Sequence, residues 1–175
     1  LKKIKNILED GSIKKVGQNI KFDYMVLKQH GITIQSMEDT MLISYILDAG
    51  LNRHNLDILS EIHLNHKTIS YKELVGSGKN KLNFSDINLK EATEYAAEDA
   101  DVTLRLYNKL KERLDEEKLN KVYEVFEKPM VKLLSDLEIK GIKVNKSYLE
   151  ELSKKFEKRI KKIEKQIYSL AGKEF

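Results

Sequence analysis

The sequence predicts an α/β portion followed by an all-helical segment. Short apolar stretches typical of strands occur at residues 14–16 and 32–34, and each precedes residues with helical spacing. Beyond the charged stretch at 115–121 only helical spacing recurs, apart from a short extended piece at 142–144. We therefore expect one domain over residues 1–118 and a second segment over residues 119–175.

Composition narrows the class of protein. The chain has 175 residues, 41% of them hydrophobic and 34% charged, which is enough to bury a core. No apolar run is long enough for a membrane span, so we expect no membrane partner. The lack of cysteine argues against an oxidising compartment and a thiolate metal site, and predicts a cytoplasmic protein. A net charge of +4 allows a nucleic-acid partner without requiring one.

The first elements follow from their spacing and end signals. Residues 1–10 are predicted to form a helix that ends at Gly11, and residues 22–30 a helix that ends at Gly31. A helix over 36–48 is expected to start with Ser36 as its N-cap, and another helix covers 56–64.

The central region contains a long irregular stretch. Residues 65–88 show no clear period and predict a surface loop with about one helical turn, of the kind that often carries function. Asn88 then caps a helix that reaches about Leu114, with Glu91 in the capping-box position. Helical spacing resumes near residue 123, and Pro129 suits the first turn of a helix that ends near Gly141.

The final helix is amphipathic and strongly charged. Its apolar residues recur every three or four positions and form one narrow stripe that needs a partner surface: Leu149, Leu152, Phe156, Ile160, Ile163, Ile167 and Leu170. In the isolated chain, a second copy can supply that surface. Its basic cluster is compatible with a solvated face or with contacts to phosphates: Lys154, Lys155, Lys158, Arg159, Lys161 and Lys162.

Three carboxylates cluster in the helical stretch YAAEDADVTLRL, residues 95–106. At about 100° per residue, Asp99 falls among the apolar positions, whereas Glu98 and Asp101 fall on the opposite side. A buried carboxylate requires a cation, a hydrogen-bond donor or a metal. Tyr95 lies one turn earlier and is expected to point into the same cleft. A structural role, with Asp99 held by a backbone amide or a buried Arg, is equally compatible with the pattern.

A second inward-facing pair is predicted in VGQNIKFDYMVL, residues 16–27. Asn19 and Asp23 are four residues apart and follow the first strand. They are candidates for a polar site, and helix capping explains them equally well.

These two stretches together resemble the 3'-5' proofreading exonuclease of bacterial family A DNA polymerases. The stretches EDTMLISYIL, RHNLDILSEIHL and GSGKNKLNF also match, and EKPMVKLLSDLEIKGIKVN resembles the opening of the polymerase domain. The resemblance implies a ribonuclease H-like DEDD exonuclease fold of the tyrosine subclass. It assigns residues 1–118 to part of the exonuclease domain and residues 119–175 to the first helices of the polymerase domain.

The resemblance also implies roles for individual residues. Two Mg²⁺ or Mn²⁺ ions would support phosphodiester hydrolysis, with Asp99 and Asp23 as metal ligands and with Tyr95 and Asp99 as catalytic residues. Tyr95 would orient the attacking water. DNA would be the partner, as a single-stranded 3' end at this cleft and as duplex near the C-terminal helices. Substrate contacts would come from Gln18, Asn19, Phe22, Arg53 and Tyr71, although family members often have Tyr at the position of Phe22.

One part of the family pattern is absent. The strand with an Asp-x-Glu pair should precede Leu1, and Glu9 and Asp10 do not replace it. We therefore expect a fragment that lacks its first strands, is inactive alone and can associate with itself through exposed surfaces. One alternative is a non-catalytic, exonuclease-like DNA-binding or scaffold domain of a polymerase. Another is an RNA-processing nuclease of the same superfamily.

Overall fold

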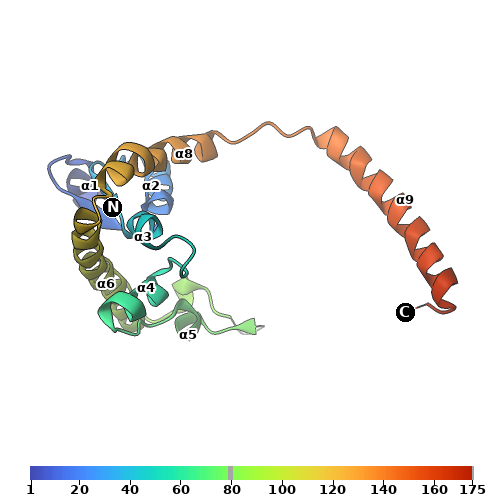
Figure 1. Cartoon of the computed structure of the whole chain (residues 1–175), viewed down its shortest axis with the longest axis horizontal. Helices are drawn as coiled ribbons and strands as arrows, with labels where there is room; N and C mark the ends of the chain where they lie inside the picture. Colours follow the sequence, from blue (N-terminus) through green and yellow to red (C-terminus); the bar gives the residue numbers. More distant parts are fainter. Residues whose placement is uncertain (79–80, 175) are drawn as a thin grey trace. The chain divides into compact units, whose positions relative to one another are not determined.

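The computed structural model describes residues 1–78 and 81–174 (Figure 1). Lys79 and Asn80, within the GSGKNKLNF stretch, and Phe175 lie outside the described residues. The chain divides into two compact units, Leu1–Ile139 and Lys140–Phe175, and each is described by itself.

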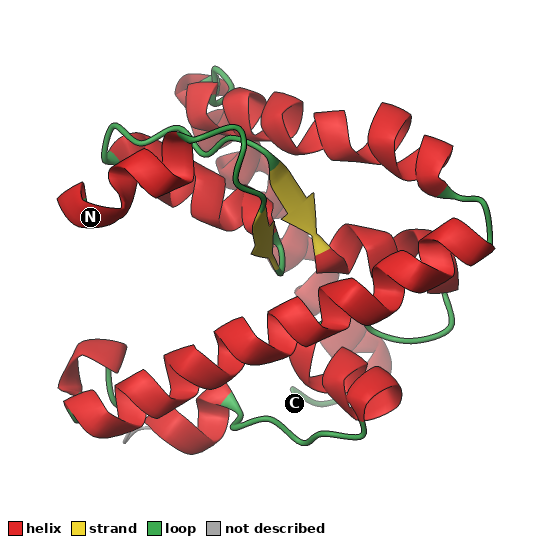
Figure 2. Ribbon diagram, turned by 90° about the vertical axis from the view of Figure 1, so that its left-hand side faces the viewer, coloured by secondary structure: helices red, strands yellow, loops and turns green. Residues whose placement is uncertain are grey.

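The first unit contains a two-stranded parallel sheet. Strand β1 (Lys15–Gly17) pairs with β2 (Met37–Asp39), in a register that sets Val16 opposite Glu38. Helix α2 (Ile20–Gln29) connects the two strands, and Figure 2 shows the strands side by side among the helices. This β-α-β unit confirms the predicted α/β class.

The second strand lies where the sequence did not predict one. The strand predicted at 32–34 is wrong: these residues form an irregular segment in which Ile32 and Ile34 are buried. The helix predicted from Ser36 starts later, as α3 (Thr40–Asp48), and its N-cap is Asp39. The acidic residues of β2, Glu38 and Asp39, are each only 3% exposed, and a buried strand with two acids does not show an apolar pattern.

The Asp39 carboxylate joins the starts of two helices. It accepts hydrogen bonds from the backbone N–H groups of Asn19 (3.0 Å), Ile20 (2.9 Å) and Met41 (2.9 Å). The turn before α2 is also tight, because a Cβ atom at Gly17 would lie 2.9 Å from the Ile20 side chain. A carboxylate from β2 therefore fixes how α2 leaves β1.

Further helices of this unit, up to residue 116, are α1 (Lys2–Glu9), α4 (Leu56–Leu64), α5 (Tyr71–Val75), the 3₁₀ turn η2 (Phe84–Asp86) and the long helix α6 (Leu89–Glu116). The Asn88 side chain accepts a hydrogen bond from the backbone N–H of Glu91 (3.0 Å), which confirms the predicted cap of α6. The predicted loop at 65–88 is more ordered than expected, since it contains both α5 and η2.

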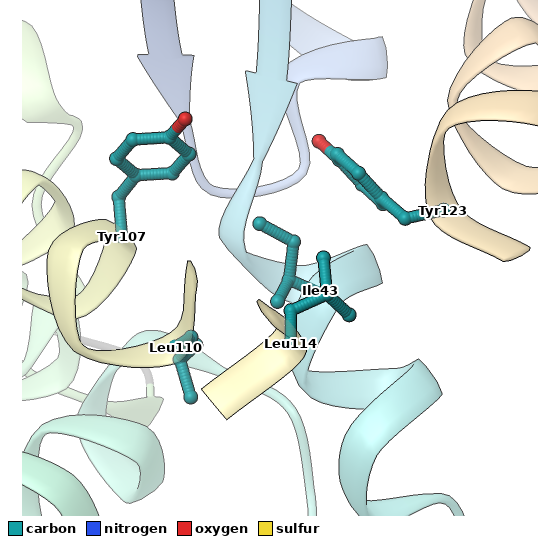
Figure 3. Close-up of a cluster of buried hydrophobic side chains, with 5 residues drawn as sticks. All are labelled: Ile43, Tyr107, Leu110, Leu114 and Tyr123. Carbon is teal, nitrogen blue, oxygen red and sulfur yellow. The ribbon is translucent and has the colours of Figure 1, made fainter. Parts of the chain in front are cut away.

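Helix α6 organises the core by packing against α3, α4 and β1. One buried cluster joins Ile43 of α3 to Tyr107, Leu110 and Leu114 of α6 and to Tyr123 (Figure 3). A second cluster joins Leu59 of α4 to Val102 and Leu106 of α6. These apolar contacts occupy the face of α6 that the helical periodicity predicted.

The chain after α6 continues through α7 (Asn120–Val122), the π-helical turn η3 (Tyr123–Glu127) and α8 (Lys128–Lys140). Tyr123 is fully buried, and its hydroxyl donates to Glu38 (3.0 Å) and accepts from the backbone N–H of Asp39 (2.9 Å). Lys128 Nζ lies 2.8 Å from the other Glu38 oxygen. The break between the compact units thus falls after Ile139. The domain boundary expected near residue 118 comes from the sequence pattern and a family resemblance. The division into compact units does not test it, so it stays a prediction.

The second unit is dominated by α9 (Lys146–Ala171), which starts at an Asn145 cap that accepts from the backbone N–H of Tyr148 (3.0 Å). Residues 142–144 form no strand. No residue of α9 is buried, so its apolar stripe has no cover within this unit. Among the described residues, no helix has both the length and the apolar character needed to cross a membrane.

We predict that Asp39→Ala lowers the free energy of unfolding by about 3 kcal/mol, because one buried and two partly buried backbone N–H groups lose a charged acceptor. Urea denaturation followed by circular dichroism measures this change. The matched control is Asp101→Ala, which removes an exposed acid from α6 and should change stability by less than about 0.5 kcal/mol. Equal effects of the two substitutions would contradict the role assigned to Asp39.

Candidate functional site

A polar pocket of about 560 Å³ lies in the first unit, at the end of β1. It collects five of the eight site residues predicted from the sequence, namely Gln18, Asp23, Tyr71, Tyr95 and Asp99. The side chains come from α2, α5 and α6 and from the turn after β1. The remaining lining residues are Val16, Gly17, Leu56, Asp57, Ala100 and Thr103.

Tyr95 and Asp99 are two pocket side chains that are coupled to each other. They lie one turn apart on α6, and the Tyr95 hydroxyl donates a hydrogen bond to the Asp99 carboxylate. Burial, and then the charges of Asp57 and Glu98, raise the pKa of Asp99, while the bond from Tyr95 opposes that shift. Burial, followed by the charge of Asp99, raises the pKa of Tyr95 to about 12. The phenol therefore keeps its proton at neutral pH and remains a hydrogen-bond donor.

Two further carboxylates line the same pocket. Asp23 extends from the first turn of α2. Partial burial, followed by the charge of Asp39, raises its pKa, although the residue keeps contact with solvent. Asp57 extends from the first turn of α4 and accepts a hydrogen bond from the Thr68 hydroxyl (2.7 Å). Asp57 was not predicted as a site residue, since an acid in a first helical turn is usual and carries no functional signal.

The pocket carboxylates are of the ligand type that a hard divalent cation prefers, but too few of the described ones are grouped to hold one. Oxygen ligands are those that Mg²⁺ and Mn²⁺ prefer. Across residues 1–78 and 81–174, however, no three His, Cys, Asp or Glu side chains are grouped so that they could hold a metal ion. Asp23 and Asp99 thus fit part of a ligand set and require further oxygen donors.

The other acids of α6 differ from the helical-wheel prediction in one case. Asp101 is exposed and pairs with Arg105 (3.2 Å), as predicted. The expectation that Glu98 faces solvent is wrong, because its side chain is only 19% exposed. It accepts from the backbone N–H of Ile69 (2.7 Å) and from His66 Nε2 (2.9 Å). The segment before α5 folds back onto this side of α6. Asp99 itself is half-buried, because it borders an open pocket.

Gln18 is held by both ends of its side-chain amide. Its nitrogen donates to the backbone oxygen of His54 (2.7 Å), and its oxygen accepts from the Thr40 hydroxyl. Gln18 therefore ties the end of β1 to the loop that carries Arg53.

Three predicted substrate contacts do not line the pocket. Phe22 is 64% exposed, Arg53 is exposed, and Asn19 is an exposed residue with a left-handed backbone (φ 61°) that borders a separate groove near Met130. Their roles stay predictions.

Aromatic rings form one wall beside Tyr95. The Tyr71 and Phe84 rings are nearly parallel, with centroids 6.3 Å apart, and each meets Tyr95 at 61°. Lys81 Nζ lies 5.6 Å from the centroid of the Tyr71 ring. Phe84 was not predicted as a site residue, because it lies in a stretch without periodicity.

Comparison with known protein families identifies the fold that carries this pocket. A family model described as a 3'-5' exonuclease matches residues 1–115, which include every predicted site residue. The chain belongs to this exonuclease family. Its model ends shortly after the last apolar contact of α6.

Relatives of this exonuclease match the chain along its whole length. It is 47% identical over 175 residues to DNA polymerase I of Rhizobium leguminosarum and 38% identical to DNA polymerase I of Pseudomonas aeruginosa. The match covers 100% of this chain in both cases, but only 17% and 20% of the relatives. The chain thus spans about a fifth of the length of the curated relatives it matches.

A solved structure supports the same fold. The chain is similar to the POL domain of Pol1 from M. smegmatis, solved in complex with DNA primer-template and dNTP, with a TM-score of 0.75 and 21% identity. The similarity covers 98% of this chain and 27% of that chain.

We predict that Asp99→Asn stabilises the chain at neutral pH. An acid whose pKa is raised by folding holds its proton more tightly in the folded state, so its contribution to stability falls as pH rises through that pKa. The side-chain amide of the Asp99→Asn variant does not ionise, so the variant does not lose this stability as pH rises. Thermal unfolding of both proteins should therefore show a difference at pH 7 that vanishes below the ordinary pKa of 3.8.

The control for this experiment is Asp101→Asn on the exposed side of the same helix. It should change stability by less than about 0.5 kcal/mol at either pH. A stabilisation by Asp99→Asn that persists unchanged in acid would show that ionisation of Asp99 is not its cause.

Proposed function

We propose that this chain is part of a DNA polymerase and carries one side of its 3'-5' exonuclease site. The observation that carries the proposal is the meeting of Tyr95, Asp99 and Asp23 in one pocket of a chain that belongs to the exonuclease family. The substrate would be the single-stranded 3' end of DNA. The names of the Rhizobium leguminosarum and Pseudomonas aeruginosa relatives, both DNA polymerase I, support the polymerase context.

Each pocket residue has a role that its contacts support. Asp23 and Asp99 would hold divalent metal ions, Mg²⁺ or Mn²⁺, and bound ions would supply an activated water and stabilise charge on the phosphate. Tyr95, protonated at neutral pH, would orient the attacking water beside Asp99. Tyr71 offers an exposed ring for stacking on a base. Gln18 would act through the His54 loop, by keeping Arg53 near the bound strand.

The remaining ligands would come from a strand with an Asp-x-Glu pair that precedes these residues in the intact protein. The support for this step is the incomplete ligand set of the pocket. On this proposal the chain alone is inactive, residues 1–118 belong to the exonuclease domain, and residues 119–175 begin the polymerase domain.

We predict nuclease activity only when the upstream strands are present. The assay measures release of nucleotides from a single-stranded 3' end with Mg²⁺ or Mn²⁺, and compares this chain with the full-length protein. Asp99→Ala should lower the full-length rate at least a hundredfold, about the cost of losing one group that stabilises the transition state. Tyr95→Phe should lower it roughly tenfold or more, since only the hydroxyl is lost.

The matched control is Asp101→Ala, an exposed acid on the same helix, which should leave the rate unchanged. Full-length protein that binds DNA but releases no nucleotide under any metal condition would favour the other function, a non-catalytic DNA-binding or scaffold domain. In that case Asp99 is a structural acid.

Duplex DNA is the partner that we propose for the basic side of α9. Its lysines and its one arginine, Arg159, are exposed. Among the described residues, only some of them form an ion pair with acids of the same helix, at Lys146, Lys155 and Lys161. In the isolated chain, we expect the apolar stripe of α9 to be covered by a second copy.

We predict that replacing Lys158, Arg159 and Lys162 with Ala in the full-length protein weakens duplex binding and flattens its salt dependence. Each lost phosphate contact lowers the slope of log K against log salt by about 0.9. Fluorescence anisotropy across a salt series measures it. Replacing Lys2, Lys3 and Lys121 removes the same charge elsewhere and should leave the slope unchanged. Equal slopes for both triple variants would contradict the α9 contact.

A further inference from the structure

Phe84 lies in an ordered segment beside the pocket. The backbone N–H of Leu82 donates to Val75 at the end of α5 (2.9 Å). The backbone N–H of Asn83 donates to the Asp86 carboxylate (3.2 Å), and the backbone N–H of Asp86 donates to the Asn83 backbone carbonyl (2.9 Å), which closes the η2 turn that presents Phe84. The Phe84 side chain remains 41% exposed, so burial in the main core does not explain its position.

The Phe84 ring contacts two rings that belong to the proposed site. Its centroid lies 6.3 Å from that of Tyr71, with an angle of 15° between the planes, and 6.2 Å from that of Tyr95, at 61°. Tyr71 and Tyr95 are themselves 6.3 Å apart. Offset-parallel and edge-to-face geometries are the arrangements that aromatic rings prefer. Each of the three rings therefore limits the movement of the other two.

We propose that Phe84 is a positioning residue for the exonuclease reaction. It fixes the Tyr95 ring so that the phenol stays bonded to Asp99, and it holds Tyr71 against the pocket wall. Without Phe84, Tyr95 keeps its place on α6 and its contact with Tyr71 but loses one of its two neighbouring rings. The kinetic consequence rests on the proposed function, whereas the fixing of the two tyrosines does not.

The position of Lys81 agrees with this role for the segment. Its ammonium group lies 5.6 Å from the centroid of the Tyr71 ring, and it comes from the same short stretch as Phe84. Cations over aromatic faces are attracted by the ring electrons. Two side chains from residues 81–84 thus contact the aromatic rings of the pocket. We therefore count this segment as part of the site.

The first experiment needs no catalysis. NMR spectra of this chain with labelled tyrosine rings should show that Phe84→Ala shifts the resonances of Tyr71 and Tyr95, because ring contacts change. The resonances of Tyr24 and Tyr123, buried elsewhere, should not move. The matched control is Phe126→Ala, an exposed ring in η3 that does not line the pocket. Unchanged Tyr71 and Tyr95 signals would overturn the proposal.

The second experiment uses the full-length protein and a double-mutant cycle. Phe84→Ala should lower kcat roughly tenfold, since small misplacements of a catalytic group are costly. In the Tyr95→Phe background the same substitution should lower kcat less than about twofold, because the hydroxyl that Phe84 positions is already absent. Phe84→Tyr keeps an aromatic ring and should restore most of the rate.

The outcomes separate this inference from the proposed function. An equal loss of kcat in both backgrounds would mean that Phe84 acts only on general stability, and would overturn its role as a positioning residue. A full-length protein that is inactive before any substitution would refute the proposed function. The positioning of Tyr95 would then be decided by the NMR shifts alone.

Discussion

The carboxylate of Asp39 is the constraint on which the rest of the first unit depends. Three backbone N–H groups from the starts of α2 and α3 converge on it, so two helices take their direction from one side chain. The acid is nearly inaccessible to solvent, and burial raises its pKa although those bonds oppose the shift. Because Asp23 lies in the first turn of α2, its place in the pocket follows from this bond set.

A second polar network links the sheet to the helices that follow α6. Glu38 precedes Asp39 on β2 and is satisfied by the Tyr123 hydroxyl and the Lys128 ammonium group, at 3.0 and 2.8 Å. Removing one partner of a buried charge is costly, so this network fixes where η3 and α8 begin. It explains why residues 119–139 pack with the exonuclease portion although the family model ends at residue 115. The end of the family match and the break between the compact units thus fall at different places.

Periodicity predicted the parts of the structure where one face of a helix is apolar. It identified α6 and the alignment of Tyr95 with Asp99, since both depend only on helical geometry. It failed at β2, because a strand that carries Glu38 and Asp39 buries acids whose partners are distant in sequence. It failed at Glu98 for the same reason, since His66 and the backbone of Ile69 are brought to it by a fold of the loop. Asp57 and Phe84 depend on tertiary contacts alone and had no local signal.

Acids of this unit differ in how their charge is compensated. Asp48 is paired with Arg113 at 2.8 Å, and that bond, followed by further attraction, holds its pKa below the ordinary value. Within the described part of the chain no ion pair reaches Asp23, Asp57 or Asp99, and the pKa values of Asp23 and Asp99 are raised. Folding therefore disfavours the ionised form of Asp23 and Asp99 in the pocket and favours the ionised form of Asp48. Asp48 is stabilised by a cation and Asp39 by backbone N–H groups of this chain. Asp23 and Asp99, in contrast, line one pocket without a cation from the described residues, so a bound external cation would offset the cost of their charge. This uncompensated charge adds a physical reason, beside the meeting of these residues in one pocket, to assign the proposed chemistry there.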